Sequence, residues 1–329
     1  MIECGGGPLR AALHAPAQTQ ATEPWNWDEA TLRDLVSRLR AGPRHTMTLP
    51  PDAQVAVALS FDADDETPWL RSLDGMPASA LAAAEYDHRV GTPRILELLA
   101  RFSAPATFFF PGVSALLHPD QVRAVVDAGH EVGVHGWIHE SPEVLEPGQE
   151  RALLARSLDV LESVSGVRPR GMRTPSFGFS PHTLELAVEF GLTYDSSLMA
   201  DDEPYELLLA GQPTGVVEVP VDWSRDDAAY FVTDRHGGLR PQPSPRQLLE
   251  AWRDEYRAAR RDKGLFQLTL HPDLIGRRSR LVILEELLSD MLADGDVWFA
   301  THAQVADAWW QTRPPVEQEG SHADESQPT

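Results

Sequence analysis

The chain has 329 residues, of which 42% are hydrophobic, enough to bury a sizeable core as one large α/β domain or as two ordinary domains. Its 50 acidic residues outnumber the 28 basic ones, and the formal net charge of -22 repels nucleic-acid phosphates and anionic lipid head groups. We therefore expect neither nucleic acid nor a membrane surface as a partner. Cys4 is the single cysteine, and neither an export signal nor an apolar run of membrane-spanning length is found, which favours a soluble cytoplasmic protein.

The two ends differ in composition from the middle of the chain. Residues 1–23 are rich in Gly, Ala, Pro and Gln, and residues 312–329 have few apolar side chains, so we expect a flexible N-terminal segment and a disordered tail. Residues 24–52 include the run WNWDEATLRDLVSRLRAG, whose apolar spacing and Asp28 predict an appended helix followed by a linker. The main domain is expected over residues 53–311.

In this main domain, short β-rich runs alternate with longer helical runs, a pattern typical of strand-helix units and a largely parallel sheet. Several helical runs end at a glycine, as helix C-termini often do. The seven expected strands, a number close to that of a barrel, are 55–61, 105–110, 130–135, 192–197, 216–222, 265–271 and 297–302.

Chemically competent side chains follow these strands. In α/β barrels the active site lies at the carboxyl ends of the strands, so residues far apart in the sequence can meet there. The alternative for any one of them is an ordinary polar residue at the point where a strand leaves the core. The set comprises Asp62, Asp64, His135, Arg173, Asp195, Asp222 and His271.

His135 and His139 form an H-x-x-x-H pair, a spacing that would place both imidazoles on one side of a helical turn and suit one metal ion. The pair alone is weak, because 12 histidines in this length give about 0.4 such pairs by chance. Asp62 and Asp64 strengthen the hypothesis: side chains two apart on a strand point the same way, and two such carboxylates repel unless a cation or a proton lies between them.

These residues suggest a division of labour in which Asp64 joins the two histidines as a metal ligand and Asp62 remains free as a base. Three protein ligands leave positions open for water and substrate, as catalytic sites require, whereas structural zinc sites are closed by four ligands and usually use cysteine. His271 is the candidate acid for a departing nitrogen, and Arg173 could keep Asp62 ionised. The plainer alternatives are a packed histidine at a strand end and a surface ion pair.

The motifs SFDADDE, HGWIHE, RTPSFGFS, YDSS and LTLHP, in this order, resemble those of the polysaccharide deacetylases, carbohydrate esterase family four. The resemblance spans residues 53–311 and implies an α/β fold with a distorted, incomplete (β/α) barrel of about seven parallel strands. It implies one divalent metal ion, commonly Zn²⁺ but sometimes Co²⁺, Ni²⁺ or Mn²⁺, and hydrolysis of an N-acetyl or related amide. It also implies Asp62 as base, His271 as acid, Arg173 as support for the base, and Asp64, His135 and His139 as ligands.

The first motif departs from the commonest family form, because Ala63 separates Asp62 from Asp64 and Asp65 follows, which leaves the assignment among the three carboxylates open. The spaced form, with HGWIHE and LTLHPDLIGRRSRL, is more similar to a branch with cytoplasmic peptidoglycan deacetylase homologues, allantoinase-like enzymes and cyclic imide hydrolases. VDWSRDDAAYF resembles the fourth motif of that branch, although acidic loop residues are often only solvated. The candidate substrate-pocket residues are Trp137, Pro175, Trp223, Asp226 and Asp227.

Three functions remain: removal of an N-acetyl group from an amino sugar, hydrolysis of a small cyclic imide or ureide at the same site, and an inactive carbohydrate-binding barrel. We expect a small molecule or short oligosaccharide as substrate, and the resemblance implies a homo-oligomer, a tetramer. The segments 198–215 and 224–245 are expected to narrow the open face, with aromatic side chains that line the pocket or simply pack: Trp69, Trp137, Trp223, Tyr230 and Phe231.

Overall fold

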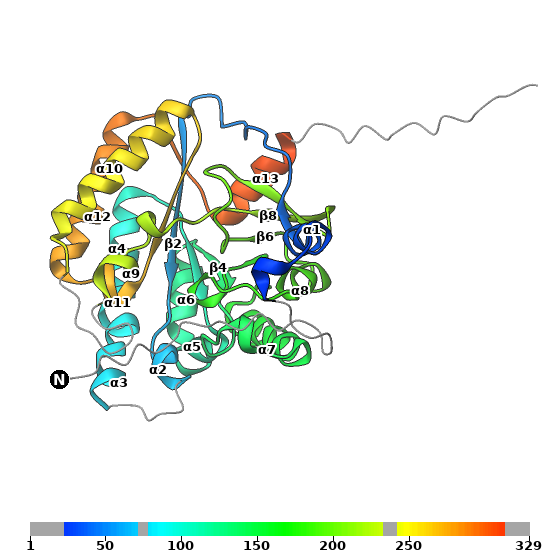
Figure 1. Ribbon diagram of the computed structural model, residues 1–329. Helices are drawn as coiled ribbons and strands as arrows, with labels where there is room; N and C mark the ends of the chain where they lie inside the picture. The colour runs from blue at the N-terminus through cyan, green and yellow to red at the C-terminus, as the bar shows by residue number, and fades with distance from the viewer. Residues whose placement is uncertain (1–22, 72–77, 233–241, 313–329) are drawn as a thin grey trace, which may run out of the picture.

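The computed structural model describes residues 23–71, 78–232 and 242–312. Within these residues, ten strands form one curled sheet surrounded by helices (Figure 1). The strands are β1 (Leu39–Ala41), β2 (Val55–Asp62), β3 (Thr107–Phe110), β4 (Glu131–Val134), β5 (Gly171–Met172), β6 (Tyr194–Asp195), β7 (Tyr205–Leu209), β8 (Gln212–Glu218), β9 (Leu265–Leu270) and β10 (Val297–Phe299). The expected flexible N-terminal segment and disordered tail fall almost wholly outside the described residues.

The sheet is a parallel, incomplete barrel with an antiparallel edge. Its strand order is β1-β7-β8-β6-β5-β4-β3-β2. On its other side β2 pairs with β9, while β10 lies beside the start of β2 on the β3 side. Among the described residues β8 and β9 do not pair with each other, and the isolated bridge from Asp226 to Thr269 joins the segment after β8 to β9, so the barrel stays open there. The expected fold class is confirmed.

All seven expected strands are present, and three were not anticipated. β5 is only two residues long, and Gly171 lies so close to the Tyr194 ring that a β-carbon there would be 2.1 Å from it. β7 lies within 198–215, which was expected to cover the open face. That expectation is wrong for its second half, where Ala210 and Gly211, both with positive φ, turn the chain into an antiparallel hairpin with β8.

The N-terminal part begins with η1 (Pro24–Asn26) and the expected helix α1 (Glu29–Ser37), whose first turn is capped by Asp28 through the backbone N–H of Thr31. It then forms β1, which pairs antiparallel with β7. This short edge strand was not predicted from the sequence pattern.

The helices pack around the sheet, with α10 and α12 against each other on one side and α5, α6 and α7 grouped on another (Figure 1). None of the described helices is long and apolar enough to cross a membrane. Their bounds are α2 (Thr67–Leu70), α3 (Ala78–Ala84), the π-helix η2 (Asp87–Gly91), α4 (Thr92–Phe102), α5 (Gly112–Leu117), α6 (Pro119–Asp127), η3 (Pro142–Val144), α7 (Pro147–Ser165), η4 (Pro175–Phe177), α8 (Thr183–Glu189), η5 (Trp223–Arg225), α9 (Ala228–Phe231), α10 (Pro245–Asp262), α11 (Pro272–Ile275), α12 (Arg278–Asp294) and α13 (His302–Thr312).

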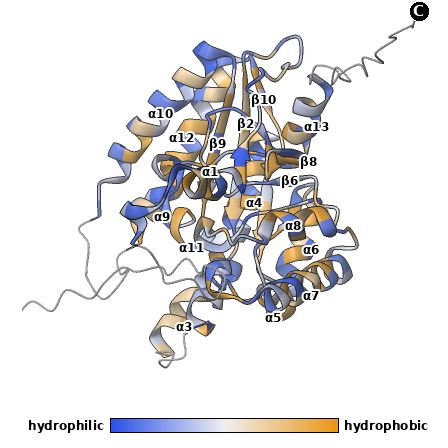
Figure 2. Ribbon diagram, turned by 45° about the vertical axis from the view of Figure 1, so that its right-hand side comes forward, coloured by the Kyte–Doolittle hydropathy of each residue, from blue (hydrophilic) through white to orange (hydrophobic). Residues whose placement is uncertain are grey.

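Strand β2 explains where the site lies. Its eight residues are buried, and because side chains alternate along a strand, its two faces differ. Val55, Val57, Leu59 and Phe61 enter the main core beneath the helices, whereas Ala56 and Ala58 face the barrel interior. Figure 2 shows the hydrophobic strands and the mixed surfaces of the outer helices. The interior face of β2 therefore continues from small apolar residues to Ser60 and Asp62 at its carboxyl end.

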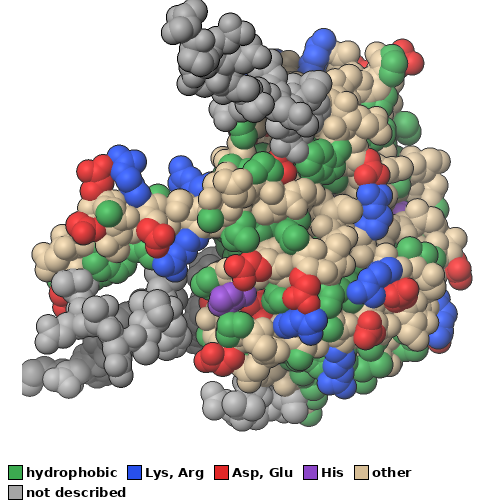
Figure 3. Space-filling view, turned by 90° about the vertical axis from the view of Figure 1, so that its right-hand side faces the viewer, with side chains coloured by type: hydrophobic (Ala, Val, Ile, Leu, Met, Phe, Trp, Pro, Cys, Tyr) green, Lys and Arg blue, Asp and Glu red, His purple; other side chains and the backbone are tan. Residues whose placement is uncertain are grey.

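The surface charge is dispersed. Exposed ion pairs such as Arg151 with Glu189 and Arg170 with Asp307 place basic side chains beside acidic ones. On the face shown in Figure 3, acidic and basic side chains are likewise intermingled. The negative charge of the chain is thus not gathered into one acidic patch on that face.

Candidate active site

The carboxyl ends of β2, β4, β5 and β9 bring the predicted catalytic and metal-ligating side chains together. Asp62 ends β2, His135 follows β4, Arg173 follows β5 and His271 follows β9. Oδ2 of Asp62 lies 3.9 Å from Nε2 of His135 and 4.0 Å from Nε2 of His271. Residues up to 209 positions apart thus share one small, mostly buried space.

Asp62 is held by a fully buried arginine. Nη1 of Arg173 donates hydrogen bonds to Oδ1 of Asp62 at 2.6 Å and to Oγ of Ser60 at 2.9 Å. Its Nε and Nη2 donate to the carbonyl oxygen and the hydroxyl of Ser196, both at 2.8 Å, and its guanidinium lies 4.4 Å from the Phe109 ring centre. The fixed guanidinium matches a charge-assisted ion pair far better than the alternative of a surface ion pair.

The charge state of Asp62 follows from these contacts. Burial raises the pKa of Asp62, but the positive charge of Arg173, with smaller contributions from His135 and His271, outweighs burial and holds the pKa below its usual value. Asp62 is therefore an ionised carboxylate at neutral pH, as a base must be.

Asp64, His135 and His139 converge as a potential ligand set, with one ligand atom from each lying within 4.8 Å of the others. Oδ1 of Asp64 is 3.5 Å from Nε2 of His135, and Oδ2 is 3.4 Å from Nε2 of His139. Two ligands about 2.1 Å from one ion at a tetrahedral angle are about 3.4 Å apart, so the spacing fits a metal ion. Oδ1 of Asp64 is buried and accepts no hydrogen bond, which also suits a ligand atom.

In both histidines Nε2 is the ring nitrogen that faces Asp64. Nδ1 of His135 lies 2.7 Å from the carbonyl oxygen of Arg173, so it carries the proton and leaves the Nε2 lone pair free. Burial lowers the pKa of His135 to about 4 and that of His139 well below its usual value, which keeps both imidazoles neutral. The donor types and the neutral imidazoles therefore fit a divalent metal ion. Burial raises the pKa of Asp64 well above its usual value, and a cation held there would favour its carboxylate form.

The expectation that the histidine pair lies on a helical turn is wrong, because residues 135–141 form an irregular loop after β4. Gly136 and His139 have positive φ, and the Glu140 carboxylate accepts the backbone N–H groups of Trp137 and Ile138. This tight turn, rather than helical periodicity, brings the imidazole rings to 5.1 Å between centres.

His271 is paired with Asp227 through Nδ1, the ring nitrogen that does not face Asp62. Its Nδ1 lies 2.8 Å from Oδ1 of Asp227 and 3.8 Å from Oδ1 of Asp226, while its backbone N–H donates to Oδ2 of Asp227 at 3.2 Å. Burial lowers the pKa of His271, but the hydrogen bond and charge of Asp227, with Asp226 and Asp62, outweigh burial and hold it well above its usual value. The raised pKa favours the protonated imidazole, and its Nε2 lies 4.0 Å from Oδ2 of Asp62.

Comparison with known proteins identifies the family of this chain. The polysaccharide deacetylase family model matches residues 52–194. The chain is 30% identical over 292 residues to the peptidoglycan deacetylase of Helicobacter pylori, an alignment that covers 79% of this chain and 98% of that protein. The chain belongs to the polysaccharide deacetylase family. It is thus a hydrolase of a family that acts on carbon-nitrogen bonds.

Solved structures extend the comparison. A Mycobacterium smegmatis protein named as a polysaccharide deacetylase is 37% identical, with a TM-score of 0.74 over 84% of this chain and 99% of that one. The allantoinase PuuE is 25% identical, with a TM-score of 0.70 over 81% of this chain and 93% of that one. Structures of differently named enzymes thus share the fold of this deacetylase-family chain.

The candidate substrate-pocket residues occupy different places in this family member. Pro175 packs against Gly136, beside His135, and Trp223 is 43% exposed with its ring 4.8 Å from that of Phe177. Phe177 lies 6.0 Å from the Arg173 guanidinium. Neither Phe177, which lies in RTPSFGFS, nor Ser196, which lies in YDSS and contacts Arg173, was among the predicted site residues.

Other aromatic side chains pack away from the site. The Trp137 ring lies 3.8 Å from the Arg156 guanidinium of α7 and beside Gly112 of α5. Phe231 is buried in the main core, with Arg280 4.2 Å from its ring, and the Tyr230 hydroxyl lies 3.4 Å from the Ser224 carbonyl oxygen. For these, the alternative of ordinary packing is the better description. We therefore leave Trp137 out of the proposed substrate contacts.

Proposed function

We propose that this chain is a metal-dependent hydrolase that removes an N-acetyl group from an amino sugar. The observation that carries the proposal is the juxtaposition of the ligand set Asp64, His135 and His139 with Asp62 and His271, whose side chains approach to 4.0 Å. An inactive barrel would be expected to lack a base, an acid or a ligand, and each has a residue here in a suitable place.

A divalent ion held by Asp64, His135 and His139 would polarise the amide carbonyl and lower the pKa of water. Asp62, kept ionised by Arg173, would accept the proton of the attacking water. His271 would donate a proton to the departing nitrogen, and this proton is needed because an amine anion is a very poor leaving group.

The proposed ion is Zn²⁺. Two imidazole nitrogens and one carboxylate oxygen suit Zn²⁺, and the same donors accept Co²⁺, Ni²⁺ and Mn²⁺. Metal analysis of protein purified without added metal, followed by exchange with each ion, tests the identity. A higher kcat/KM with another ion, at equal occupancy, would contradict zinc as the preferred ion.

The proposed substrate is a small molecule or a short oligosaccharide encountered in the cytoplasm, and the exposed Trp223 and the neighbouring Phe177 are proposed to contact it. The likeness to the allantoinase PuuE favours a second candidate, hydrolysis of a cyclic imide or ureide at the same site. A panel of a chitooligosaccharide, a peptidoglycan fragment, intact peptidoglycan, succinimide and allantoin would separate them by kcat/KM. Preference for intact polymer would overturn the substrate proposal.

Two further proposals concern organisation. We propose a homo-tetramer, which light scattering during size-exclusion chromatography would test. We also propose that residues 24–52 are an accessory segment of the barrel domain 53–311. Removal of residues 1–52 should then leave a folded hydrolase, and an unfolded product would contradict this boundary.

A further inference from the structure

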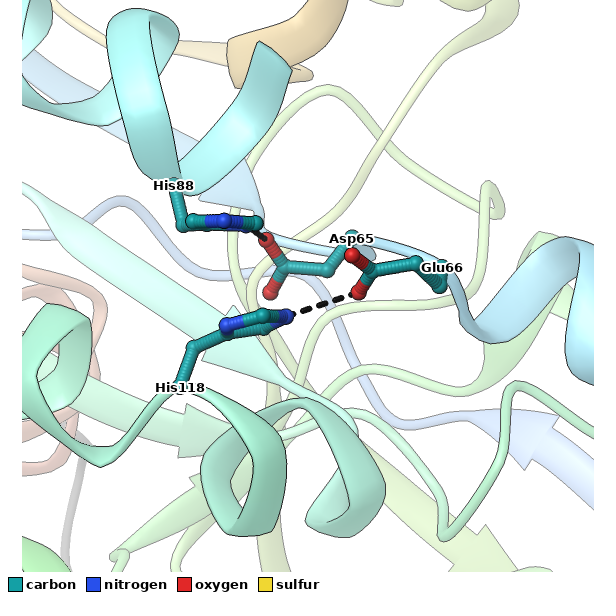
Figure 4. A group of neighbouring side chains, drawn as sticks. All are labelled: Asp65, Glu66, His88 and His118. Carbon is teal, nitrogen blue, oxygen red and sulfur yellow. Dashed lines mark hydrogen bonds and ion pairs between the residues drawn. The ribbon is translucent and has the colours of Figure 1, made fainter. Parts of the chain in front are cut away.

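A second group of metal-binding side chain types lies beside the proposed active site. Asp65 and Glu66 follow β2, His88 lies on the π-helix η2 and His118 joins α5 to α6. One ligand atom from each residue lies within 4.8 Å of the others, and Figure 4 shows the two carboxylates reaching the edges of the two imidazoles. Three separate segments of the chain thus contribute four potential ligands to one point.

The distances in this cluster are short. Nε2 of His118 lies 2.8 Å from Oε2 of Glu66, and Nδ1 of His88 lies 3.3 Å from Oδ1 of Asp65. The two imidazole rings are stacked, 3.7 Å apart between centres and inclined by 16°. One nitrogen of each ring, Nδ1 of His88 and Nε2 of His118, therefore faces a carboxylate.

Asp65 supplies an independent sign of a missing ligand. Its side chain is fully buried, and its Oδ2 accepts no hydrogen bond, although a buried carboxylate oxygen is normally satisfied. Among the described residues, Asp65 and Glu66 form ion pairs with these two histidines and with no lysine or arginine. Two adjacent carboxylates whose ion-pair partners are both imidazoles lack a fixed positive charge, and a divalent cation would provide one.

The cluster is separate from the proposed catalytic ligand set. Asp64 contacts His135 and His139, whereas Asp65, with a φ of 50°, contacts His88 instead. A cavity of about 450 Å³ lined by His88, His118 and neighbouring residues of α4 and α6 adjoins the second cluster and gives an ion a route to it.

We propose that Asp65, Glu66, His88 and His118 form a second divalent-metal site. Two nitrogens and two carboxylate oxygens make a four-ligand set suited to Zn²⁺ or a similar first-row ion, and such a set is closed, as in structural sites. The ion ties the turn after β2 to η2 and to the α5–α6 junction. Because Asp64 belongs to the same turn, the ion also fixes one ligand of the proposed catalytic site.

Equilibrium dialysis with Zn²⁺ after chelator treatment, followed by metal analysis, tests the site. The parent should bind two ions per chain, while His88→Gln/His118→Gln and His139→Ala should each bind one. His182→Gln, which alters an exposed histidine paired with Glu185, is the matched control and should bind two. The second site would be overturned if the parent bound one ion and the His88→Gln/His118→Gln double variant kept that ion. It would also be overturned if the double variant bound two ions.

The design distinguishes failure of the two sites. One parental ion retained by His139→Ala but lost from His88→Gln/His118→Gln would support the second site and contradict the catalytic ligand set. If the double variant fails to fold, Glu66→Gln can be introduced into His139→Ala instead. Glutamine keeps the shape of the glutamate side chain, and the affinity of His139→Ala for Zn²⁺ should fall about tenfold or more. Unchanged affinity in that pair would overturn the proposal. Added Zn²⁺ should also raise the Tm of His139→Ala, since an ion that binds only the folded chain stabilises it.

Discussion

The contact between His271 and Asp227 sets the pH range in which His271 can donate a proton, so Asp227→Asn should narrow that range. Asparagine keeps the shape of the side chain but removes the negative charge 2.8 Å from Nδ1 of His271. A hydrogen bond to a charged group contributes about 1.5 to 3 kcal/mol, and one pH unit of pKa corresponds to about 1.4 kcal/mol. The pKa of His271 should therefore fall.

The direction of the effect on activity follows from the required protonation state. His271 must be protonated to act as an acid, so kcat/KM is retained below its pKa and is lost as the pH rises through that pKa. In Asp227→Asn the loss begins at lower pH, and between the two pKa values kcat/KM falls about ten- to a hundredfold. The low-pH limb, which reflects Asp62, should stay in place.

The assay is a profile of kcat/KM against pH on a soluble N-acetylated sugar. Asp226→Asn is the graded control: Oδ1 of Asp226 is 3.8 Å from Nδ1 of His271, so its removal should move the high-pH limb less. Circular dichroism would check that both variants fold. A folded Asp227→Asn with an unmoved high-pH limb would refute the role of this pair, as would a larger movement in Asp226→Asn.

Four further substitutions test the other roles. Asp62→Asn should keep the metal while nearly abolishing turnover, whereas Asp64→Asn should impair both; the reverse result in metal analysis and kinetics would exchange their roles. His271→Ala should slow amide hydrolysis much more than hydrolysis of activated aryl esters, whose leaving oxygen needs no proton, and equal losses would exclude the acid role. Arg173→Met breaks a buried ion pair and should lower stability by about 3 to 5 kcal/mol in denaturant unfolding. A cost near zero would contradict the buried pairing.

Much of the site was predictable because strand ends carry its chemistry. Asp62, His135, Arg173 and His271 each follow a buried strand or a short extended segment, and parallel strands place their carboxyl ends at one edge. The alternation of strands and helices therefore sufficed to predict that these residues meet.

Features set by local backbone geometry were not predictable. The turn that joins His135 to His139 depends on positive φ at Gly136 and His139, whereas the spacing suggested a helix. β7 and β5 were missed because the first is an antiparallel edge strand inside an apparent loop and the second has only two residues.

The second cluster was hidden for a different reason. Asp65 and Glu66 stood in a recognised motif, but His88 lies on η2 and His118 lies between α5 and α6, and neither follows a strand end. Their proximity depends on how η2 and the α5–α6 junction pack beside the sheet, which local sequence patterns do not specify.

The central claim is that an ion held by Asp64, His135 and His139 enables hydrolysis of an N-acetyl amide. The most direct measurement is acetate release from a soluble N-acetylated chitooligosaccharide by chelator-treated protein before and after Zn²⁺ is restored. The parent should lose activity on chelation and regain it with Zn²⁺, while folded His139→Ala should stay inactive throughout. Full activity in the chelated, metal-free parent, or full restoration of His139→Ala by Zn²⁺, would contradict the account.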